Sequence, residues 1–364
     1  MSSIQKQTNK EASRRVITFA AINKRLQRNI PEATEEWNTR KTYMLWGKKN
    51  DYPNYLLKLY DTVGTLQSVI AGSVKYTVGD DVLTQKLGNK MNKTGETARE
   101  LVVKLAFDYW VFGGFAMQVI RSNVGEVSEL YHLPLNFLRW DKKAQIFFYS
   151  EDWLDSRTKP DERPKFVPDF TDQKDTVLLV KQAHLGTYPK PVYNAAIKAC
   201  EIEAGVDDFH LSNIENSFMS SAILHFKNGD PTDEIKDEIE KNVSEKFCGA
   251  NNAGRPVLIF DDSDSLDIQT LDMPDFADRY NSLASHCQQR IFSAFHANPN
   301  LFGIPTENLG FNNEEYEASF KLFNRTMIQP VQMLIIGAFD RIFGEVGSIQ
   351  IKPFSMDRAI QTLE

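Results

Sequence analysis

Two long amphipathic helical patterns enclose a short β-α-β segment, and this arrangement restricts the fold more than any other feature of the sequence. The patterns cover residues 191–216 and 274–297, with apolar side chains at helical spacing and polar residues on the other faces. Neither helix has the composition of one buried on all sides. We therefore expect the enclosed residues 217–262 to form a small module that the two helices hold away from the body.

The enclosed module has strong start and stop signals. A strand pattern over residues 220–226 precedes a turn, and Asp230 with Pro231 then supplies the N-cap and first position of a helix that ends near Phe247. A second strand pattern follows at residues 256–260. This order predicts a β-α-β unit.

Residues 51–190 mix helical and strand patterns and predict an α+β body. We expect one helix over residues 54–76 before Gly79, and a second helix that begins at Thr94 with Glu96 in its first turn and ends at Gly113-Gly114. Polar, Pro-rich residues 151–175 predict a loop. The strand patterns, four of which predict an antiparallel meander, cover residues 115–122, 126–133, 136–140, 144–150 and 176–180.

The C-terminal part combines a loop with an interrupted helix. Residues 298–312 contain Pro299, Gly303, Pro305 and Gly310, which predicts a loop. A helical pattern then covers residues 313–343 with Pro330 inside it. Because proline lacks the amide hydrogen and its ring clashes with the preceding turn, we expect the helix to be interrupted near Thr326–Pro330.

The charge is distributed unevenly along the chain. The net charge is −7, yet residues 1–50 hold 11 Lys or Arg against 4 Asp or Glu, so the other 314 residues carry −14. The sequence predicts a basic arm on an acidic body. Such an arm could contact nucleic acid or an acidic partner, or be solvated, whereas the acidic body argues against tight wrapping on DNA.

Motifs of common enzyme classes are missing from the sequence. It contains no GxxxxGK[ST], GxGxxG, GxSxG or HExxH motif, and its six histidines and three cysteines lack metal-ligand spacing. No segment approaches about 18 uninterrupted apolar residues, and the polar N-terminus lacks the apolar core of a signal peptide. We expect no cofactor, no resident metal and no membrane association, with the cysteines in a reducing compartment.

An aspartate cluster leaves an enzymatic alternative open. Asp261, Asp262, Asp264 and Asp267, followed by Asp272 and Asp275, could supply carboxylates to a metal-dependent nuclease. The cluster is one short run after a strand, however, and no Lys or Glu lies at a recognisable nuclease spacing from it. We therefore favour a solvated turn over a metal site. A third alternative is a monomeric binding protein of mixed α/β fold.

Four segments, in order, resemble the portal proteins of tailed bacteriophages, including the HK97-like and prophage portals. They are WGKKNDYPNYLLKLYDTVGTLQSVIAGSVKYTVGDD, YWVFGGFAMQVIRSNVGEVSELYHLP, NNAGRPVLIF and AFHANPNLFGIPTENLGFNNEEYEASFKLFNRTMIQPVQMLI. The resemblance extends over about residues 45–345. The HANPNLFGIP segment departs from the family's usual turn, and little chain remains here for the helical crown of larger portals.

The resemblance implies a structural virion protein without enzymatic activity. Its subunits would form a ring, typically of twelve, at one capsid vertex, through which double-stranded DNA passes non-specifically during packaging and ejection. Implied partners are the terminase large subunit, a head-completion or adaptor protein, and the major capsid protein or a scaffold. The virion, after assembly in the host cytoplasm, is the implied location.

The resemblance also implies a portal-type α+β fold with eight segments. Clip residues Lys227, Asp230, Glu234 and Lys241 would face terminase and connector proteins, and tunnel-loop residues Asn300, Thr306, Glu307, Asn308 and Asn312 would face DNA. The segments are a basic arm (1–50), a wing (51–190), a stem helix (191–216), the clip (217–262), a second stem helix (263–297), the tunnel loop (298–312), a long kinked wing helix (313–345) and a short tail or crown remnant (346–364).

Overall fold

The chain folds into two compact units, each of which is formed by two separate parts of the sequence. Unit 1 comprises Met1–Asn29 and Ala204–Ala284, and unit 2 comprises Ile30–Glu203 and Ser285–Glu364. The computed structural model describes residues 16–17, 31–38, 42–153, 155, 159–169, 172–182, 186–215, 222–226, 232, 234–235, 237–239, 241, 257–260, 267–270, 276–304 and 313–355.

Unit 2 contains most of the described helices and strands. Its α-helices are α1 (Tyr52–Thr62), α2 (Gly64–Val78), α3 (Ala98–Phe112), α7 (Asn313–Phe323) and α8 (Gln329–Phe343). Its short helical turns are η1 (Lys86–Asn89), η2 (Leu135–Phe137), η3 (Val192–Ala196), η4 (Pro299–Phe302) and the π-helical η5 (Asn324–Ile328). Its strands are β2 (Glu35–Asn38), β3 (Tyr43–Trp46), β4 (Asp81–Leu83), β5 (Gly114–Arg121), β6 (Val127–Leu133), β7 (Leu138–Trp140), β8 (Ile146–Tyr149), β9 (Asp161–Pro164), β10 (Asp175–Lys181) and β14 (Gln350–Lys352).

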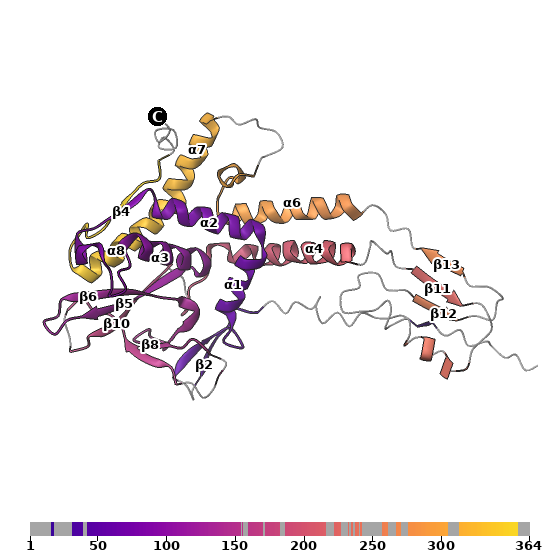
Figure 1. Ribbon diagram of the computed structural model, residues 1–364, viewed down its shortest axis with the longest axis horizontal. Helices are drawn as coiled ribbons and strands as arrows, with labels where there is room; N and C mark the ends of the chain where they lie inside the picture. Colours follow the sequence, from indigo (N-terminus) through magenta and orange to yellow (C-terminus); the bar gives the residue numbers. More distant parts are fainter. Residues whose placement is uncertain are drawn as a thin grey trace, which may run out of the picture. The chain divides into compact units, whose positions relative to one another are not determined.

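The core of unit 2 lies between an antiparallel sheet and a layer of helices. The sheet has the strand order β10-β5-β6, and α3 covers one of its faces, with α2 and α8 packed on α3 (Figure 1). Helix α3 ends at Gly113, as the sequence predicts, in a left-handed conformation with φ of 87°. A Cβ atom there would lie 2.0 Å from the carbonyl oxygen of Lys190, so only glycine permits this close approach.

The strands of the expected meander divide between two sheets. Strand β5 pairs with β6 as predicted, and β7 pairs with β8, but β7, β8 and β9 form their own sheet. Strand β9 lies inside residues 151–175, so the prediction of a loop there was wrong in part. Its sequence DERP carries no apolar alternation, and its pairing with β8 is decided by tertiary contacts instead.

The single helix predicted over residues 54–76 is two helices. Val63 is extended, with φ of −110° and ψ of 104°, and separates α1 from α2. The periodic apolar pattern continues across the break because Val63 itself is buried, at 1% exposure. The pattern therefore locates the buried face correctly and does not reveal the change in chain direction.

Residues 31–38 and 42–50 of the predicted basic arm are part of unit 2. Strands β2 and β3 form a hairpin, and the Glu35 carboxylate accepts hydrogen bonds from the backbone amides of Thr187 and Tyr188, both at 2.8 Å. The Tyr188 hydroxyl donates to the Met44 carbonyl at 2.6 Å. The Trp46 side chain is 1% exposed and stacks on the Tyr188 ring, with ring centroids 4.4 Å apart.

Unit 1 is built around a four-stranded sheet. Its strands are β1 (Val16–Ile17), β11 (Ala222–Phe226), β12 (Val257–Phe260) and β13 (Asp267–Thr270), in the order β1-β12-β11-β13 (Figure 1). Strands β11 and β12 are parallel, as the predicted β-α-β unit requires. Strand β1 comes from the predicted arm and adds to the edge of β12, a pairing for which the sequence gives no signal.

The long helices predicted over residues 191–216 and 274–297 are present, and in sequence each one includes residues of both units. They are α4 (Ile197–Glu215), preceded by the turn η3, and α6 (Phe276–Ala294). Within unit 1 the ring of Phe209 on α4 stacks on Tyr280 of α6, with centroids 4.6 Å apart. The two patterns thus form neighbouring helices.

The predicted interruption of the last long helix is a π-helical turn. Residues Asn324–Ile328 form η5 between α7 and α8, immediately before Pro330. Because Pro330 has no amide hydrogen to donate to the carbonyl four residues earlier, the chain gains no α-helical bond there and accommodates an extra residue in the turn.

The junction between α8 and β14 depends on one carboxylate. The Asp340 carboxylate accepts hydrogen bonds from the backbone amide of Ser348 at 2.9 Å and from its hydroxyl at 2.8 Å. Burial acts to raise the pKa of Asp340, but the hydrogen bonds from Ser348 and Gly347 outweigh it and hold the pKa below the usual 3.8.

We predict a pH-dependent loss of stability in Asp340→Ala. The folded-state pKa is depressed, so the carboxylate stabilises the fold above its unfolded pKa, and this contribution disappears as the pH falls through the folded pKa. Thermal unfolding should show the variant less stable than wild type at pH 7, with the difference shrinking below pH 3.8. Exposed Asp61→Ala is the control. A pH-independent difference would contradict this explanation.

Candidate functional site

The start of the predicted tunnel loop is held in a short 3₁₀ turn. Asn298 caps η4, since its Oδ1 accepts a hydrogen bond from the Asn300 amide at 3.1 Å. The Asn298 Nδ2 donates to the Ser319 Oγ on α7, also at 3.1 Å. One side chain therefore links the residues before the 305–312 segment to the helix after it.

Aromatic rings surround Tyr76 of α2 and connect three parts of unit 2. The Tyr76 hydroxyl donates to the Leu301 carbonyl of η4 at 2.9 Å. Burial raises the pKa of Tyr76 well above its usual value of 10, so the hydroxyl remains a donor at neutral pH. The neighbouring rings lie 5.1–6.2 Å from the Tyr76 ring between centroids, and they belong to Phe302, Phe320, Phe323 and Phe354.

Gly72 makes room for the Phe302 ring one turn earlier in α2. A Cβ atom at Gly72 would lie 2.6 Å from two ring carbons of Phe302. The Phe302 ring also contacts Phe292 and Phe323, with centroids 5.7 and 5.8 Å away. Because these neighbours confine the ring, a side chain at position 72 would displace η4 from α2.

The structure describes one of the five predicted tunnel-loop residues. Asn300 lies in η4, where its amide is bound to Asn298, and its carbonyl accepts a hydrogen bond from the Gly303 amide. The remaining four lie outside the described residues: Thr306, Glu307, Asn308 and Asn312. The anchors at Tyr76 and Gly72 were missed by sequence reasoning, since no local pattern distinguishes them from other residues of a buried helix.

The predicted clip residues are described in part. Glu234 and Lys241 are exposed and belong to the helical residues between β11 and β12. Lys227 and Asp230 lie outside the described residues, as do Asp261, Asp262, Asp264, Asp272 and Asp275 of the aspartate cluster. Asp267 lies in β13, so at that position the expectation of a solvated turn was wrong.

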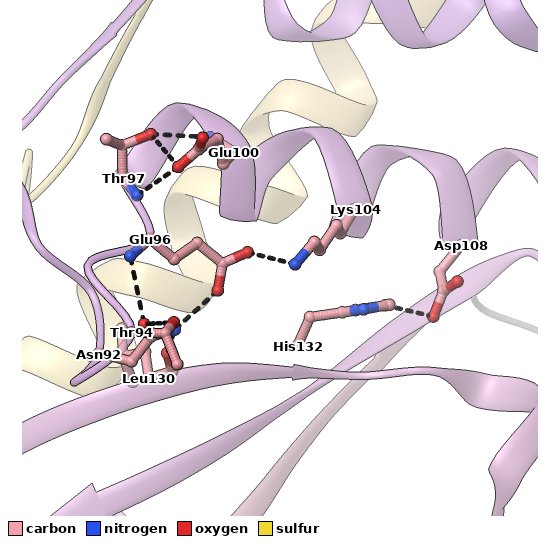
Figure 2. Close-up of polar contacts among 9 residues, drawn as sticks. All are labelled: Asn92, Thr94, Glu96, Thr97, Glu100, Lys104, Asp108, Leu130 and His132. Atoms are coloured by element: carbon pink, nitrogen blue, oxygen red, sulfur yellow. Dashed lines mark hydrogen bonds and ion pairs between the residues drawn. The ribbon is translucent and has the colours of Figure 1, made fainter. Parts of the chain in front are cut away.

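The start of α3 differs from the sequence prediction. Figure 2 shows that Thr97, not Thr94, is the N-cap: its hydroxyl oxygen accepts from the Glu100 amide, and the Glu100 carboxylate accepts from the Thr97 amide at 2.8 Å. Together these bonds form a capping box. The hydroxyl of Thr94 instead donates to Asn92, in the turn before the helix.

Two side chains of α3, Lys104 and Asp108, each have a polar partner outside the helix. In Figure 2 the Lys104 ammonium lies 2.6 Å from the Glu96 carboxylate, and the His132 Nε2 lies 2.9 Å from Asp108. Asp108 is buried and also accepts a hydrogen bond from the Leu135 amide at 3.1 Å. The polar atoms of these side chains already have partners within the fold, and their contacts help to hold α3 on the sheet. No group of three or more His, Cys, Asp or Glu suited to a metal occurs in the described part of the chain.

We predict that Gly72→Ala and Gly337→Ala have opposite effects. Gly337 lies inside α8, where an added Cβ atom would meet no other atom within 4 Å, so alanine there should stabilise the protein by about 0.5–1 kcal/mol. At Gly72 the same gain in helix propensity is opposed by the clash with Phe302, so the free energy of unfolding should fall by about 1 kcal/mol or more. Urea unfolding measures both. Equal stabilisation would contradict the proposed close packing.

Comparison with known proteins identifies the family. The sequence profile described as phage portal protein matches residues 61–354. A protein of Rickettsia bellii (strain RML369-C) described only as uncharacterized is 30% identical over 156 residues, covering 40% of this chain and 39% of that relative. The chain thus spans about two fifths of the length of that relative in the match. Within the described residues, no helix has both the length and the apolar composition needed to cross a bilayer.

Solved structures with the same fold come from phage-like particles. A chain from the neck of a native gene transfer agent particle, computed with C12 symmetry, matches with a TM-score of 0.56 and 18% identity over 90% of this chain and 87% of that chain. The HK97 family phage portal protein of Corynebacterium diphtheriae matches with a TM-score of 0.53 and 11% identity over 82% and 93% of the two chains. The resemblance in sequence, the portal-type mixed fold and the profile match agree, and this chain belongs to the phage portal protein family, a structural family without enzymatic activity.

Proposed function

We propose that this protein forms the ring-shaped portal at one capsid vertex, the conduit for DNA during packaging and ejection. The observation that carries the proposal is the family match from residue 61 to residue 354, which includes both the predicted tunnel loop and the predicted clip. A ring is supported by the fold shared with the gene transfer agent neck, which was computed with C12 symmetry. We propose twelve subunits in a virion component assembled in the host cytoplasm.

The charge of the chain suits a conduit in which DNA slides. Each Lys or Arg facing a phosphate adds a salt-dependent attraction, and many of them would retain the DNA. Residues 298–312 contain no Lys or Arg, and Glu307 is their one charged residue. The side chains of Asn300, Thr306, Asn308 and Asn312 offer neutral hydrogen bonds, which favour weak and easily exchanged contacts with phosphates.

The clip is proposed as the docking surface for the terminase large subunit and then for a head-completion or adaptor protein. Glu234 and Lys241 are exposed, and Lys227 and Asp230 flank the turn before the helix in sequence. The wing and the basic arm are proposed to contact the major capsid protein or a scaffold. The nuclease alternative is not retained, because the family is structural and no observation on the described residues favours it.

The oligomeric state is the first test of the proposal. Purified full-length protein, measured by light scattering and negative-stain imaging over a concentration series, should form rings with a central hole and a mass near twelve times 41.6 kDa. A chain that stays monomeric at every concentration and in the presence of its scaffold would contradict the ring.

We predict that combined Glu307→Lys and Asn308→Lys substitutions slow DNA packaging or ejection several-fold and leave ring assembly intact. The added positive charges would attract the DNA backbone at the narrowest point of the channel. The effect should weaken as the salt concentration rises. The matched control is Glu126→Lys with Val124→Lys, the same change in charge on exposed residues of the β5–β6 turn. Equal transport rates in both variants would contradict a loop at the DNA.

We predict that Glu234→Lys with Lys241→Glu weakens terminase binding by about tenfold without loss of the ring. Reversing both charges conserves net charge and the helical propensity of the clip helix while it disturbs complementary pairs at the interface. Binding of labelled terminase to assembled rings measures the effect. Glu126→Lys with Lys142→Glu, a charge exchange on exposed residues of unit 2 that also conserves net charge, is the control. An unchanged affinity of the Glu234→Lys with Lys241→Glu variant would exclude this surface from the docking site.

A further inference from the structure

The ends of the segment that connects η4 to α7 converge on one side chain of a buried helix. We propose that Tyr76 is the positioning residue for this loop: it fixes where the chain leaves the body before the loop and where it returns after it. The inference rests on the proposed function, in which the loop contacts DNA. It adds a residue that lies more than two hundred positions away from the loop in sequence.

The contact with the start of the loop is directional. The Tyr76 hydroxyl donates to the Leu301 carbonyl at 2.9 Å, and Leu301 is buried at 5% exposure. The ring of the next residue, Phe302, fills the space next to Gly72 of α2. The hydrogen bond restrains the orientation of η4, because it is directional. Ile304 is the last described residue before the loop, and its backbone amide donates a hydrogen bond to the Pro299 carbonyl of this turn.

The contact with the end of the loop uses the ring of the same tyrosine. Phe320 and Phe323 of α7 lie 5.3 and 6.2 Å from the Tyr76 ring in edge-on arrangements. These distances are in the range in which aromatic pairs attract one another. Because Phe320 and Phe323 are both buried, α7 cannot shift along its axis without losing these contacts. Tyr76 therefore holds both sides of the loop.

A third segment joins the same cluster. Phe354, which follows β14, packs on Tyr76 at 5.1 Å and on Phe320 at 5.9 Å. The α2 helix is itself fixed at this point, since the Gln332 amide of α8 donates to the Thr77 carbonyl at 2.9 Å. A displacement of η4 or α7 would consequently be transmitted to α2 and to the segment after β14.

The test compares Tyr76→Phe with Tyr193→Phe in the full-length protein. Tyr193 is a matched control, because its buried hydroxyl also donates to a backbone carbonyl, Val111, at 2.9 Å. Hydrogen exchange of the amides of Leu301, Gly303 and Ile304 should accelerate about five-fold in Tyr76→Phe and stay unchanged in Tyr193→Phe, as expected for loss of one hydrogen bond that stabilises local structure. DNA transport should slow in Tyr76→Phe and stay at the wild-type rate in the control.

Unchanged hydrogen exchange at these three amides in Tyr76→Phe would overturn the inference. It would also be overturned if exchange in Tyr76→Phe is faster but DNA transport is unchanged, while Glu307→Lys with Asn308→Lys does slow DNA transport. If no variant alters transport but exchange rises as expected, the anchoring role stands and the proposed place of the loop at DNA fails. Should Tyr76→Phe destabilise the whole protein, Gly72→Ala gives a second test, since it displaces Phe302 and leaves the tyrosine intact.

Discussion

The burial of α2 is the constraint on which the rest of unit 2 depends. Most residues of the helix are buried, and α1, α3, α8, η4 and η5 all pack against it. Its polar atoms are used in this packing: the Thr77 hydroxyl accepts a hydrogen bond from the Trp110 indole at 2.9 Å, and Gln332 binds the Thr77 carbonyl. Because α2 is packed on several sides, it can hold neighbouring segments such as η4 in a fixed position.

A second constraint is a buried cation that has no carboxylate partner among the described ion pairs. The Arg139 guanidinium is fully buried, and its Nε, Nη1 and Nη2 donate to Asn50, Asn136 and Leu138 at 2.6–3.0 Å. Burial lowers the pKa of Arg139 to about 10, so it remains charged at neutral pH. The Trp46 and Trp153 rings lie 5.7 and 5.0 Å from its central carbon and add cation–π attraction. These contacts of Arg139 fix the loop after β3 on the sheet that contains β7 and β8.

The charged residues of the chain have two different roles in the proposed function. In the proposed conduit the net negative charge of residues 51–364 limits attraction to DNA. The Lys104–Glu96 ion pair and the contact between His132 and Asp108 instead help to hold α3 in unit 2. Because the family carries out no catalysis, the proposed function depends on where the tunnel loop and the clip are placed. In this proposal, rigid helices position the ends of the loop, as the surrounding residues of an enzyme position its catalytic side chains.

The sequence by itself determined the two long helices that enclose the β-α-β unit and the interruption before Pro330, because helical periodicity and proline chemistry act over a few residues. The family resemblance was also visible in the sequence, in four segments in the right order. Only the tertiary structure decided the break at Val63, the strand β9 in a polar segment, and the addition of β1 to the sheet of unit 1. The same holds for Tyr76 and Gly72, whose pattern is that of any buried helix. Their partners at Leu301 and Phe302 are more than two hundred residues away, and contacts over such separations are set by the packing of the whole core, which no local pattern encodes.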